Sequence, residues 1–273
     1  MSKKPLTRDE QFLAKAAGDD VPMPKPLTRV QEFLERIVER LSGSVTEETL
    51  INAIAPLNAS IAQLSRKTIQ FRHGKGTFTA TATGTNVVWQ YGGQQVQGNS
   101  CTFDVKSDNG LICMDFDSIT YLSIQNDAEN KMDLSDLGGK ITNTIRLNGC
   151  SNITGDLSDL GGKITSTLRL DGCSNITGDL SDLGGKITST LNLYNCSSIT
   201  GVYSGTEYPK YINISKASVI PADMDANLIN FAASGVKSGT FTATGMKRTA
   251  ASDDAVATLV ANGWTVSGLT KEG

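Results

Sequence analysis

One 23-residue unit is written three times between Asp133 and Gly201 with almost no change. The copies begin at Asp133, Asp156 and Asp179, and the second of them reads DLSDLGGKITSTLRLDGCSNITG. A unit this short cannot bury its own apolar side, so such copies stack as successive turns of a solenoid, each turn packed on its neighbours. The repeat therefore predicts a mixed α/β solenoid with parallel strands over residues 119–217.

Alternation within each copy predicts which side chains face the core. In the second copy Leu168 and Leu170 alternate with polar residues, as in a short strand with one buried face. The cysteines that follow the strands, Cys150, Cys173 and Cys196, recur every 23 residues at an inward position. We interpret them as a ladder of small buried thiols, because free cysteine is commonly buried.

The array extends beyond its near-identical copies on both sides. A step of 23 residues back from the first perfect copy reaches Leu122 and Ile124, which indicates a diverged turn. On the other side, Ile212 and Ile214 fall two residues short of the period, which indicates a shortened turn.

Residues 218–273 replace the repeat with two helical patterns and two strand patterns. Asp223–Ser234 and Ser252–Asn262 carry helical apolar spacing, and we expect them to end at Gly235 and Gly263 as C-caps. Because the end of an array needs a terminator with a different outer face, we expect this segment to form a C-terminal α/β cap.

Residues 68–118 hold short alternating runs separated by Gly, Asn and Ser, which are typical of a small antiparallel sheet. We expect this β domain to cap the N-terminal end of the solenoid. The only histidine of the chain, His73, lies at its start in FRHGKG. We interpret that stretch as a linker and His73 as a surface residue, because no Cys, Asp or Glu lies at ligand spacing from it.

Residues 1–43 contain a second, unrelated repeat, in which PLTR at Pro5–Arg8 returns at Pro26–Arg29. Each copy has Thr as an N-cap and begins a short amphipathic helix. Helices this short are marginal in water, so we expect them to dock on a partner and anchor the chain. The anchoring candidates are Leu6, Phe12, Leu13, Leu27, Phe33 and Leu34. A partly disordered tail without a partner is the alternative.

Residues 44–67 carry apolar side chains at heptad spacing: Leu50, Ile54, Leu57, Ile61 and Leu64. This seam predicts a short coiled-coil-like stalk that makes the chain a homo-oligomer, and its Ile and Leu positions favour a dimer. Pro56 interrupts the seam, so a helical hairpin packed against the following domain is the alternative.

Composition and motif content argue against several classes of function. The net charge of −3 disfavours a nucleic-acid partner, which normally meets a basic face. No apolar run reaches the ~18 residues of a membrane span, and MSKKPLTRDEQF lacks the apolar core of a signal peptide. We therefore expect neither membrane insertion nor Sec-type export. Since no catalytic or nucleotide-binding motif is present, we expect a protein that is not an enzyme and has no cofactor.

The acidic residues of the repeats resemble a metal site only superficially. Asp133, Asp156 and Asp179 stack with further aspartates three residues on, as in a calcium ladder. An aspartate before a Leu-x-x-Leu turn is, however, an ordinary cap, and each turn also supplies a lysine. We expect no bound metal.

The segment LRLDGCSNITGDLSDL resembles the leucine-rich repeat pattern L-x-L-x-x-N/C-x-L, and its C-x-x-I-T-G ending is similar to variants in bacteria and their phages. The segment up to about Ser267 is similar to C-terminal tails that close such proteins. The stretch WQYGGQQVQGNSCTFDV looks like small β domains with W-D-F-G-D-G that precede such repeats. Gln90 and Gly93 replace the acidic positions, so no ion site is implied.

The PLTR helices resemble N-terminal segments of virion structural proteins from prophages of gut Firmicutes, especially head-fibre and tail-associated proteins. The resemblance implies a non-enzymatic phage virion protein on the virion surface, and it favours a trimer over a dimer. The N-terminus would then hold other virion proteins, while the repeat head binds a host-surface glycan or protein. A bacterial cell-surface adhesin or a protein-interaction module with the same repeats is the alternative.

Differences between the perfect copies indicate where a ligand binds. Only three positions change between the first and second copies and four between the second and third, mostly on the strand or just after it. Outward strand residues of a curved solenoid line its concave face, the usual recognition surface. We therefore predict one ligand-binding polar stripe made of Ser123, Gln125, Arg146, Asn148, Arg169, Asp171, Asn192, Tyr194 and Asn213.

Overall fold

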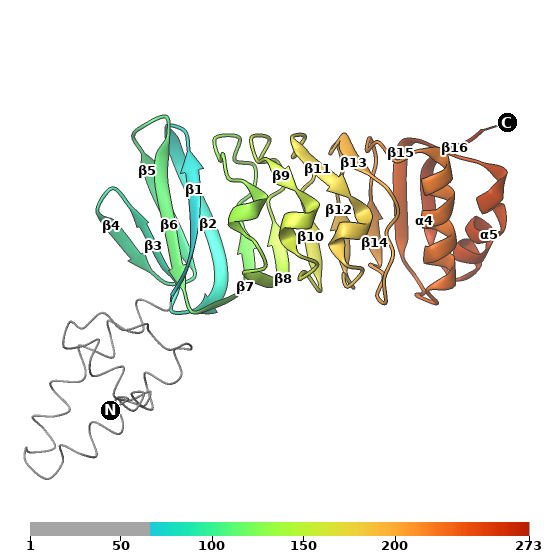
Figure 1. The fold of residues 1–273 in the computed structure, drawn as a ribbon, viewed down its shortest axis with the longest axis horizontal. Helices are drawn as coiled ribbons and strands as arrows, with labels where there is room; N and C mark the ends of the chain where they lie inside the picture. Colours follow the sequence, from blue (N-terminus) through green and yellow to red (C-terminus); the bar gives the residue numbers. More distant parts are fainter. Residues whose placement is uncertain (1–65, 273) are drawn as a thin grey trace, which may run out of the picture. The chain divides into compact units, whose positions relative to one another are not determined.

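A nine-stranded sheet runs through residues 66–272, the part of the protein that the computed structural model describes (Figure 1). The proposed anchor residues and seam residues lie outside the described residues. In spatial order the strands of this main sheet are β5 (Ser100–Val105), β2 (Gly76–Thr85), β7 (Ser118–Ser123), β8 (Ile141–Arg146), β10 (Thr167–Arg169), β12 (Thr190–Asn192), β14 (Tyr211–Asn213), β15 (Thr240–Arg248) and β16 (Thr265–Lys271). Neighbours from β7 to β16 are parallel, whereas β2 is antiparallel to both of its neighbours. The described chain is a β-rich mixed fold with a long, mostly parallel sheet and few helices.

The repeats meet in register within the main sheet. Leu168 of β10 pairs with Ile145 of β8 and with Leu191 of β12, each 23 residues away. The same row continues to Leu122 in β7 and to Ile212 in β14. One repeat therefore makes one turn, and both the diverged turn and the shortened turn are confirmed.

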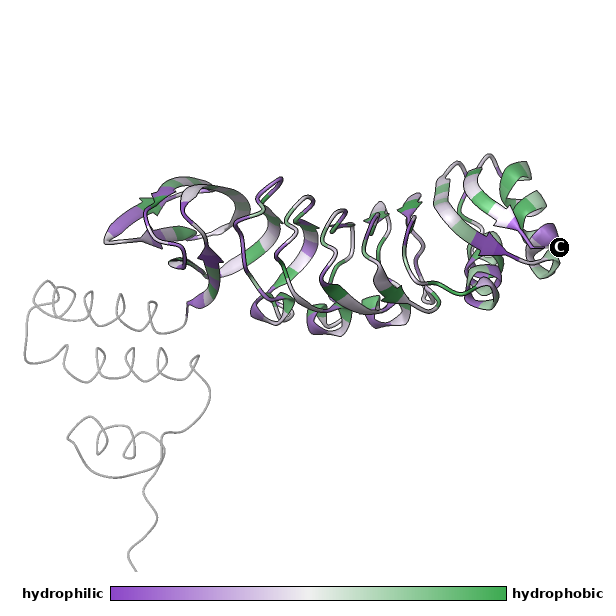
Figure 2. Ribbon diagram, turned by 90° about the horizontal axis from the view of Figure 1, so that it is seen from above, coloured by the Kyte–Doolittle hydropathy of each residue, from purple (hydrophilic) through white to green (hydrophobic). Residues whose placement is uncertain are grey.

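A 3₁₀ helix and a short strand return the chain in each perfect turn: η1 (Leu134–Asp136), η2 (Leu157–Leu160), η3 (Leu180–Leu183), β9 (Gly155–Asp156), β11 (Ile176–Asp179) and β13 (Ser198–Thr200). Figure 2 shows these helices in a row along one side of the coil. The Asp156 side chain accepts from the Ser158 backbone N–H (3.0 Å), and Asp159 accepts from the Asp156 backbone N–H (2.9 Å). The same capping box closes η1 and η3, which confirms the prediction that these aspartates are caps.

Leucines and thiols stack in columns inside the coil, and hydrophobic segments recur in successive turns (Figure 2). Leu147, Leu170 and Leu193 are fully buried. The thiol of Cys173 donates to the Leu147 carbonyl oxygen (Sγ···O 3.0 Å), and that of Cys196 donates to the Leu170 carbonyl oxygen (3.1 Å). The cysteines of the described residues are free thiols, so the predicted ladder of buried thiols is confirmed.

Two sheets, rather than the single small sheet expected, form the N-terminal β domain. A four-stranded antiparallel sheet contains β1 (Lys67–His73), β6 (Gly110–Phe116), β3 (Val88–Tyr91) and β4 (Gln94–Gln97), while β2 and β5 belong to the main sheet. Phe71, Phe78 and Trp89 pack together, with ring centroids 5.6 to 6.4 Å apart. Because β2 pairs with β7, the main sheet passes without a break from this domain into the repeats.

The interpretation of FRHGKG as a linker with a surface histidine is wrong. Its first three residues belong to β1, and only 1% of His73 is exposed. His73 Nε2 lies 3.0 Å from Asp127 Oδ1, and its Nδ1 lies 2.5 Å from the Gly74 carbonyl oxygen. Strand alternation places His73 on the same buried side as Phe71, and Asp127 from a distant loop supplies the polar partner that a buried imidazole needs.

The C-terminal segment adds two more parallel strands to the main sheet and packs two helices against them. The helices are α4 (Pro221–Ala233) and α5 (Asp253–Ala261), with the short η4 (Ala250–Ser252) before α5. Phe231 of α4 meets the rings of Phe241 and Trp264 edge-on, at centroid distances of 5.4 and 5.7 Å. These contacts bury the inner side of β15.

The C-cap of each C-terminal helix lies one residue before the expected position. The C-cap residues are Ser234 and Asn262. Gly235 and Gly263 follow them with φ of 73° and 81°, the left-handed conformation that only glycine adopts without strain. The expectation that the glycines are the caps is therefore wrong by one position, although their role in ending each helix is the one expected of a glycine there.

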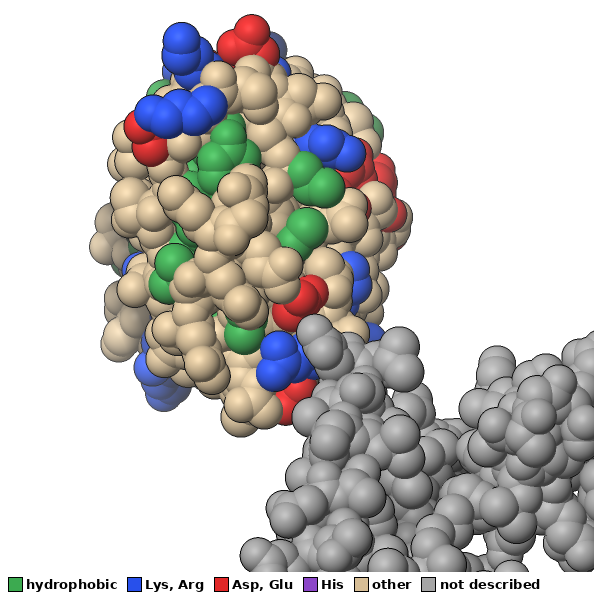
Figure 3. All heavy atoms as spheres, turned by 90° about the vertical axis from the view of Figure 1, so that its left-hand side faces the viewer, with side chains coloured by type: hydrophobic (Ala, Val, Ile, Leu, Met, Phe, Trp, Pro, Cys, Tyr) green, Lys and Arg blue, Asp and Glu red, His purple; other side chains and the backbone are tan. Residues whose placement is uncertain are grey.

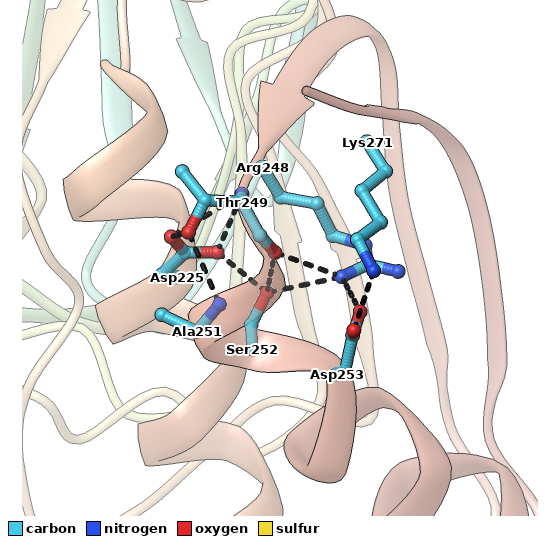
Figure 4. Close-up of polar contacts among 7 residues, drawn as sticks. All are labelled: Asp225, Arg248, Thr249, Ala251, Ser252, Asp253 and Lys271. Atoms are coloured by element: carbon cyan, nitrogen blue, oxygen red, sulfur yellow. Dashed lines mark hydrogen bonds and ion pairs between the residues drawn. The ribbon is translucent and has the colours of Figure 1, made fainter. Parts of the chain in front are cut away.

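A buried carboxylate fastens α4 to the start of α5 (Figure 4). Asp225 accepts from the Thr249 backbone N–H (3.0 Å), the Thr249 hydroxyl (2.6 Å) and the Ser252 hydroxyl (2.5 Å). Burial alone would raise the pKa of Asp225, but the hydrogen bonds from Ser252 and Thr249 outweigh it and hold the pKa below its usual value. Beside it, Asp253 pairs with Arg248 (2.6 Å) and Lys271 (2.5 Å).

Candidate binding surface on the main sheet

The nine residues of the predicted stripe lie in two adjacent rows on the outer face, which we define as the side of the main sheet that faces away from the buried leucines. Paired strand positions form the first row: Ser123, Arg146, Arg169, Asn192 and Asn213. Two residues further along each strand, backbone hydrogen bonds between turns align the second row: Gln125, Asn148, Asp171 and Tyr194. The structure therefore brings the predicted residues together on one face.

The two rows are not uniformly accessible. Ser123, Asn148 and Asn192 are buried, with 5%, 9% and 6% of their surface exposed. Gln125 and Tyr194 are exposed, and the remaining members are half-buried. Three of the nine side chains are thus buried, and the other six are partly or fully accessible.

Contacts within the rows explain part of that burial. Gln125 donates to the Ser123 hydroxyl (2.7 Å), and the Asn192 side-chain oxygen accepts from the Tyr194 backbone N–H (3.2 Å). The ammonium group of Lys216 lies 5.0 Å from the centre of the Tyr194 ring, within the range of a cation–π contact. Gln125, Asn192 and Tyr194 therefore already have partners within the protein, and these contacts fix the conformation of the outer face.

A pocket of about 260 Å³ opens on the outer face, and we call it the outer pocket. It is lined by Arg146, Thr167, Arg169, Thr190, Asn192 and Tyr211. Three of these residues belong to the predicted stripe. The other three, two threonines and a tyrosine, form a single row of paired strand positions beside it.

Sequence reasoning missed that third row for two reasons. Thr167 and Thr190 are identical from copy to copy, so a search for differences between repeats passes over them. Tyr211 lies in the shortened turn, where the period no longer gives its register. The alternation of each strand was the usable signal, because it places these residues on the same side as Arg169 and Asn192.

The two arginines of the outer pocket have different surroundings. Arg169 pairs with Asp171, with its Nε 3.2 Å from Oδ1 and its Nη2 3.4 Å from Oδ2. At the matching position in the preceding turn, Arg146 is followed by Asn148, which carries no charge. The Nε atom of Arg146 is buried and has no hydrogen-bond partner among the described residues. The outer pocket therefore holds one guanidinium that is neutralised and one that is not.

A second pocket, of about 280 Å³, lies at the β3–β4 hairpin in the N-terminal β domain. Its lining includes Gln90, Gln94, Gln95, Tyr91 and Leu111. Figure 3 views this end of the molecule, where hydrophobic side chains are separated by polar ones and charges lie mainly at the rim. None of these lining side chains is charged, so the outer pocket is the more distinctive of the two.

The thiols of the repeats are buried. Burial raises the pKa of Cys150 to about 11 and that of Cys196 to about 12, so neither thiol is a nucleophile near neutral pH.

Between residues 66 and 272, no three His, Cys, Asp or Glu side chains are grouped closely enough to hold a metal ion. Within the same range, no helix combines the length and apolarity needed to cross a bilayer. The lining of the outer pocket offers guanidinium groups, hydroxyls, an amide and an aromatic ring.

Comparison with protein-family models, with curated proteins and with solved structures finds no match to the chain.

Proposed function

We propose that the described part of the chain is a leucine-rich-repeat-like binding head of a phage virion protein, and that its outer face attaches to a ligand on the host surface. The observation that carries this proposal is the outer pocket, whose lining includes Arg169 and Asn192, paired strand residues at which the second and third copies differ. The repeats differ at outward positions but keep the inner leucines and the caps. This pattern is typical of a scaffold that presents a variable surface.

The N-terminal segment supplies the rest of the proposal. The PLTR resemblance supports attachment of residues 1–43 to other virion proteins. The heptad seam supports assembly of residues 44–67 into an oligomer, and the resemblance favours a trimer. In this arrangement several identical heads act together, so modest affinity at each outer face adds up to firm attachment.

Binding of fluorescently labelled full-length protein to cultured gut Firmicutes, measured by flow cytometry, tests the role of the outer face. A triple variant with Arg146, Arg169 and Tyr194 changed to Ala should lose most cell binding. The matched control changes Lys140, Lys163 and Lys186 to Ala, which removes charge outside the outer pocket. Loss of binding in the control alone would place the contact surface elsewhere.

Light scattering of the purified protein tests the assembly. We expect the full chain to be a trimer and a fragment beginning at Lys67 to be a folded monomer. Antibodies against the fragment should also decorate intact phage particles in electron micrographs. A monomeric full chain, or particles that remain undecorated, would contradict the virion proposal while leaving the cell-binding result to stand on its own.

A further inference from the structure

We propose that the outer pocket binds the carboxylate of an acidic sugar, with the guanidinium of Arg146 as the charged partner. This inference rests on the function proposed above and names the ligand class for it. The strongest reason is a difference between two arginines at paired positions in neighbouring strands: Arg169 has an acidic partner and Arg146 has none among the described residues.

The charge in the outer pocket is uncompensated at one position only. Asp171 holds the Arg169 guanidinium through two contacts of 3.2 and 3.4 Å. Asn148 stands at the corresponding place beside Arg146 and supplies no charge. None of the six residues that line the pocket is acidic. A ligand carboxylate would therefore complete at Arg146 the pairing that the protein itself provides at Arg169.

Two buried polar atoms at Arg146 and its neighbour Asn148 lack hydrogen-bond partners among the described residues. They are the Nε of Arg146 and the side-chain oxygen of Asn148. Buried polar atoms are normally paired, and no side-chain hydrogen bond or ion pair holds Arg146 among the described residues, so the outward nitrogens of its guanidinium remain available to a ligand in the pocket. A planar fork of N–H donors fits a carboxylate in two-point contact better than it fits a neutral group.

The other lining groups favour a sugar over an acidic peptide. The hydroxyls of Thr167 and Thr190 can donate and accept, and the amide nitrogen of Asn192 remains a donor because its oxygen is held by the Tyr194 N–H. Tyr211, which is 36% exposed, offers an aromatic ring at the rim. The lining contains no aliphatic side chain that would receive an apolar residue of a peptide.

The size of the pocket sets the size of the bound group. Its volume of about 260 Å³ lies just below the ~300 Å³ at which pockets begin to enclose drug-sized molecules. Its lining comes from four adjacent strands, which span roughly 14 Å at the usual strand spacing. The pocket therefore suits one acidic sugar unit, with the rest of a glycan chain running across the turns.

Calorimetric titration of the full-length protein with oligogalacturonate and with its methyl ester separates the charge from the rest of the ligand. The acid should bind, and the ester should bind at least about tenfold more weakly, because esterification removes the charge that pairs with the guanidinium. Arg146→Gln and Asn148→Asp should each weaken binding of the acid by a similar factor. Asn148→Asp reproduces the Arg169 and Asp171 pair already present one turn later, so this variant is expected to fold.

Two further variants complete the test. Asp171→Asn frees the second guanidinium and should tighten binding of the acid, whereas Lys163→Gln removes one charge outside the pocket and should leave binding unchanged. Equal binding of acid and ester, or wild-type binding by Asn148→Asp, would overturn the inference. Tighter binding of poly-glutamate than of oligogalacturonate would replace the sugar with an acidic peptide. Equal competition by inorganic phosphate would reduce the pocket to a general anion site.

Failure of this inference is distinguishable from failure of the proposed function. A protein that binds no acidic sugar, yet binds host cells and loses that binding in the outer-face triple variant, keeps its proposed function and loses only the ligand assignment. A protein that binds neither cells nor acidic sugar loses both.

Discussion

Leu170 and Arg169 are neighbours in sequence but lie in opposite environments. Leu170 is fully buried in a column with Leu147 and Leu193, while a third of the Arg169 side chain remains accessible and its pairing with Asp171 is local. A buried leucine loses both transfer free energy and packing when it is shortened. A half-exposed ion pair contributes little, because water screens it.

Leu170→Ala should therefore lower the free energy of unfolding by roughly 2 to 5 kcal/mol, and Arg169→Ala should lower it by less than about 1 kcal/mol. Urea denaturation followed by circular dichroism would measure both. Similar losses for the two variants would be incompatible with the observed burial of the strand.

The thiols of the described residues differ in access, which predicts an order of chemical labelling. Cys113 is half-buried, whereas Cys101, Cys150, Cys173 and Cys196 are buried. Desolvation raises the pKa of the thiol of Cys113, and Asp115 raises it further, so even this residue should react slowly at neutral pH. Alkylation with iodoacetamide followed by mass spectrometry should modify Cys113 first and the four buried thiols only after unfolding. Early modification of Cys173 would indicate that the turns open locally in the folded state.

At the scale of single residues, the sequence predicted well which side chains are buried and poorly which polar side chains contact one another. Leu168, Leu170 and the repeated cysteines follow from period and alternation, which are local properties. The partnership of His73 with Asp127 depends on a loop far away in sequence, so no local pattern contains it. The participation of Thr167 in the outer pocket was hidden because an unchanging residue carries no signal when repeats are compared only with each other.

At the scale of elements, the capped 3₁₀ helices are the most regular feature of the turns. Hydrogen bonds from the hydroxyl and backbone N–H of Ser135 lower the pKa of Asp133, and bonds from the backbone N–H and hydroxyl of Ser158 do the same for Asp156. A carboxyl whose pKa is lowered by folding contributes stability above its unfolded pKa, near ~3.9, and loses that contribution as the pH falls through the lower folded value.

We therefore expect the protein to lose stability between about pH 4 and pH 2, partly through these caps. In Asp156→Asn the amide still accepts the cap hydrogen bond but does not titrate, so this variant should show a smaller loss in acid than the wild type. Asp156→Ala should lose about 1 kcal/mol near neutral pH because the cap itself is gone, and this deficit should shrink in acid as the wild-type carboxylate becomes protonated. Thermal unfolding at a series of pH values would measure the difference, and identical acid profiles for wild type and Asp156→Asn would contradict the role of the cap.

Elements within the perfect repeats could be predicted with their register, because a strict period fixes which residues of neighbouring turns lie side by side. Outside the repeats this information ends. The helices α4 and α5 were recognisable from apolar spacing, but nothing local indicated that β15 and β16 would join the main sheet in parallel. The division of the N-terminal β domain into two sheets was equally hidden, since strand alternation does not say which strands pair.

At the scale of the whole molecule, each turn depends on its neighbours rather than on a shared centre. Deletion of residues 156–178, one complete repeat, joins Gly155 to Asp179 and restores the same junction that Gly178 makes with Asp179 in the intact chain. The remaining turns keep their register and their caps. We expect the shortened protein to fold cooperatively, with a lower melting temperature than the wild type because one set of contacts between turns is lost.

A deletion of residues 156–167 provides the matched control. It removes about half a repeat, so the buried leucines of successive turns no longer align, and the product should fail to fold. Circular dichroism and thermal melts would compare the two proteins. If both unfold alike, the turns are not interchangeable units.

The in-register stacking of nearly identical turns also determines how the number of repeats can change in the gene. Every surface between the perfect turns is almost the same surface, so a gene that gains or loses one whole repeat still encodes matching contacts at both ends of the array. If the gene is as repetitive as its protein, unequal recombination would add or remove one strand of the outer face at a time. The breadth of the outer face would then change in whole steps, while the structures that close the two ends stay the same.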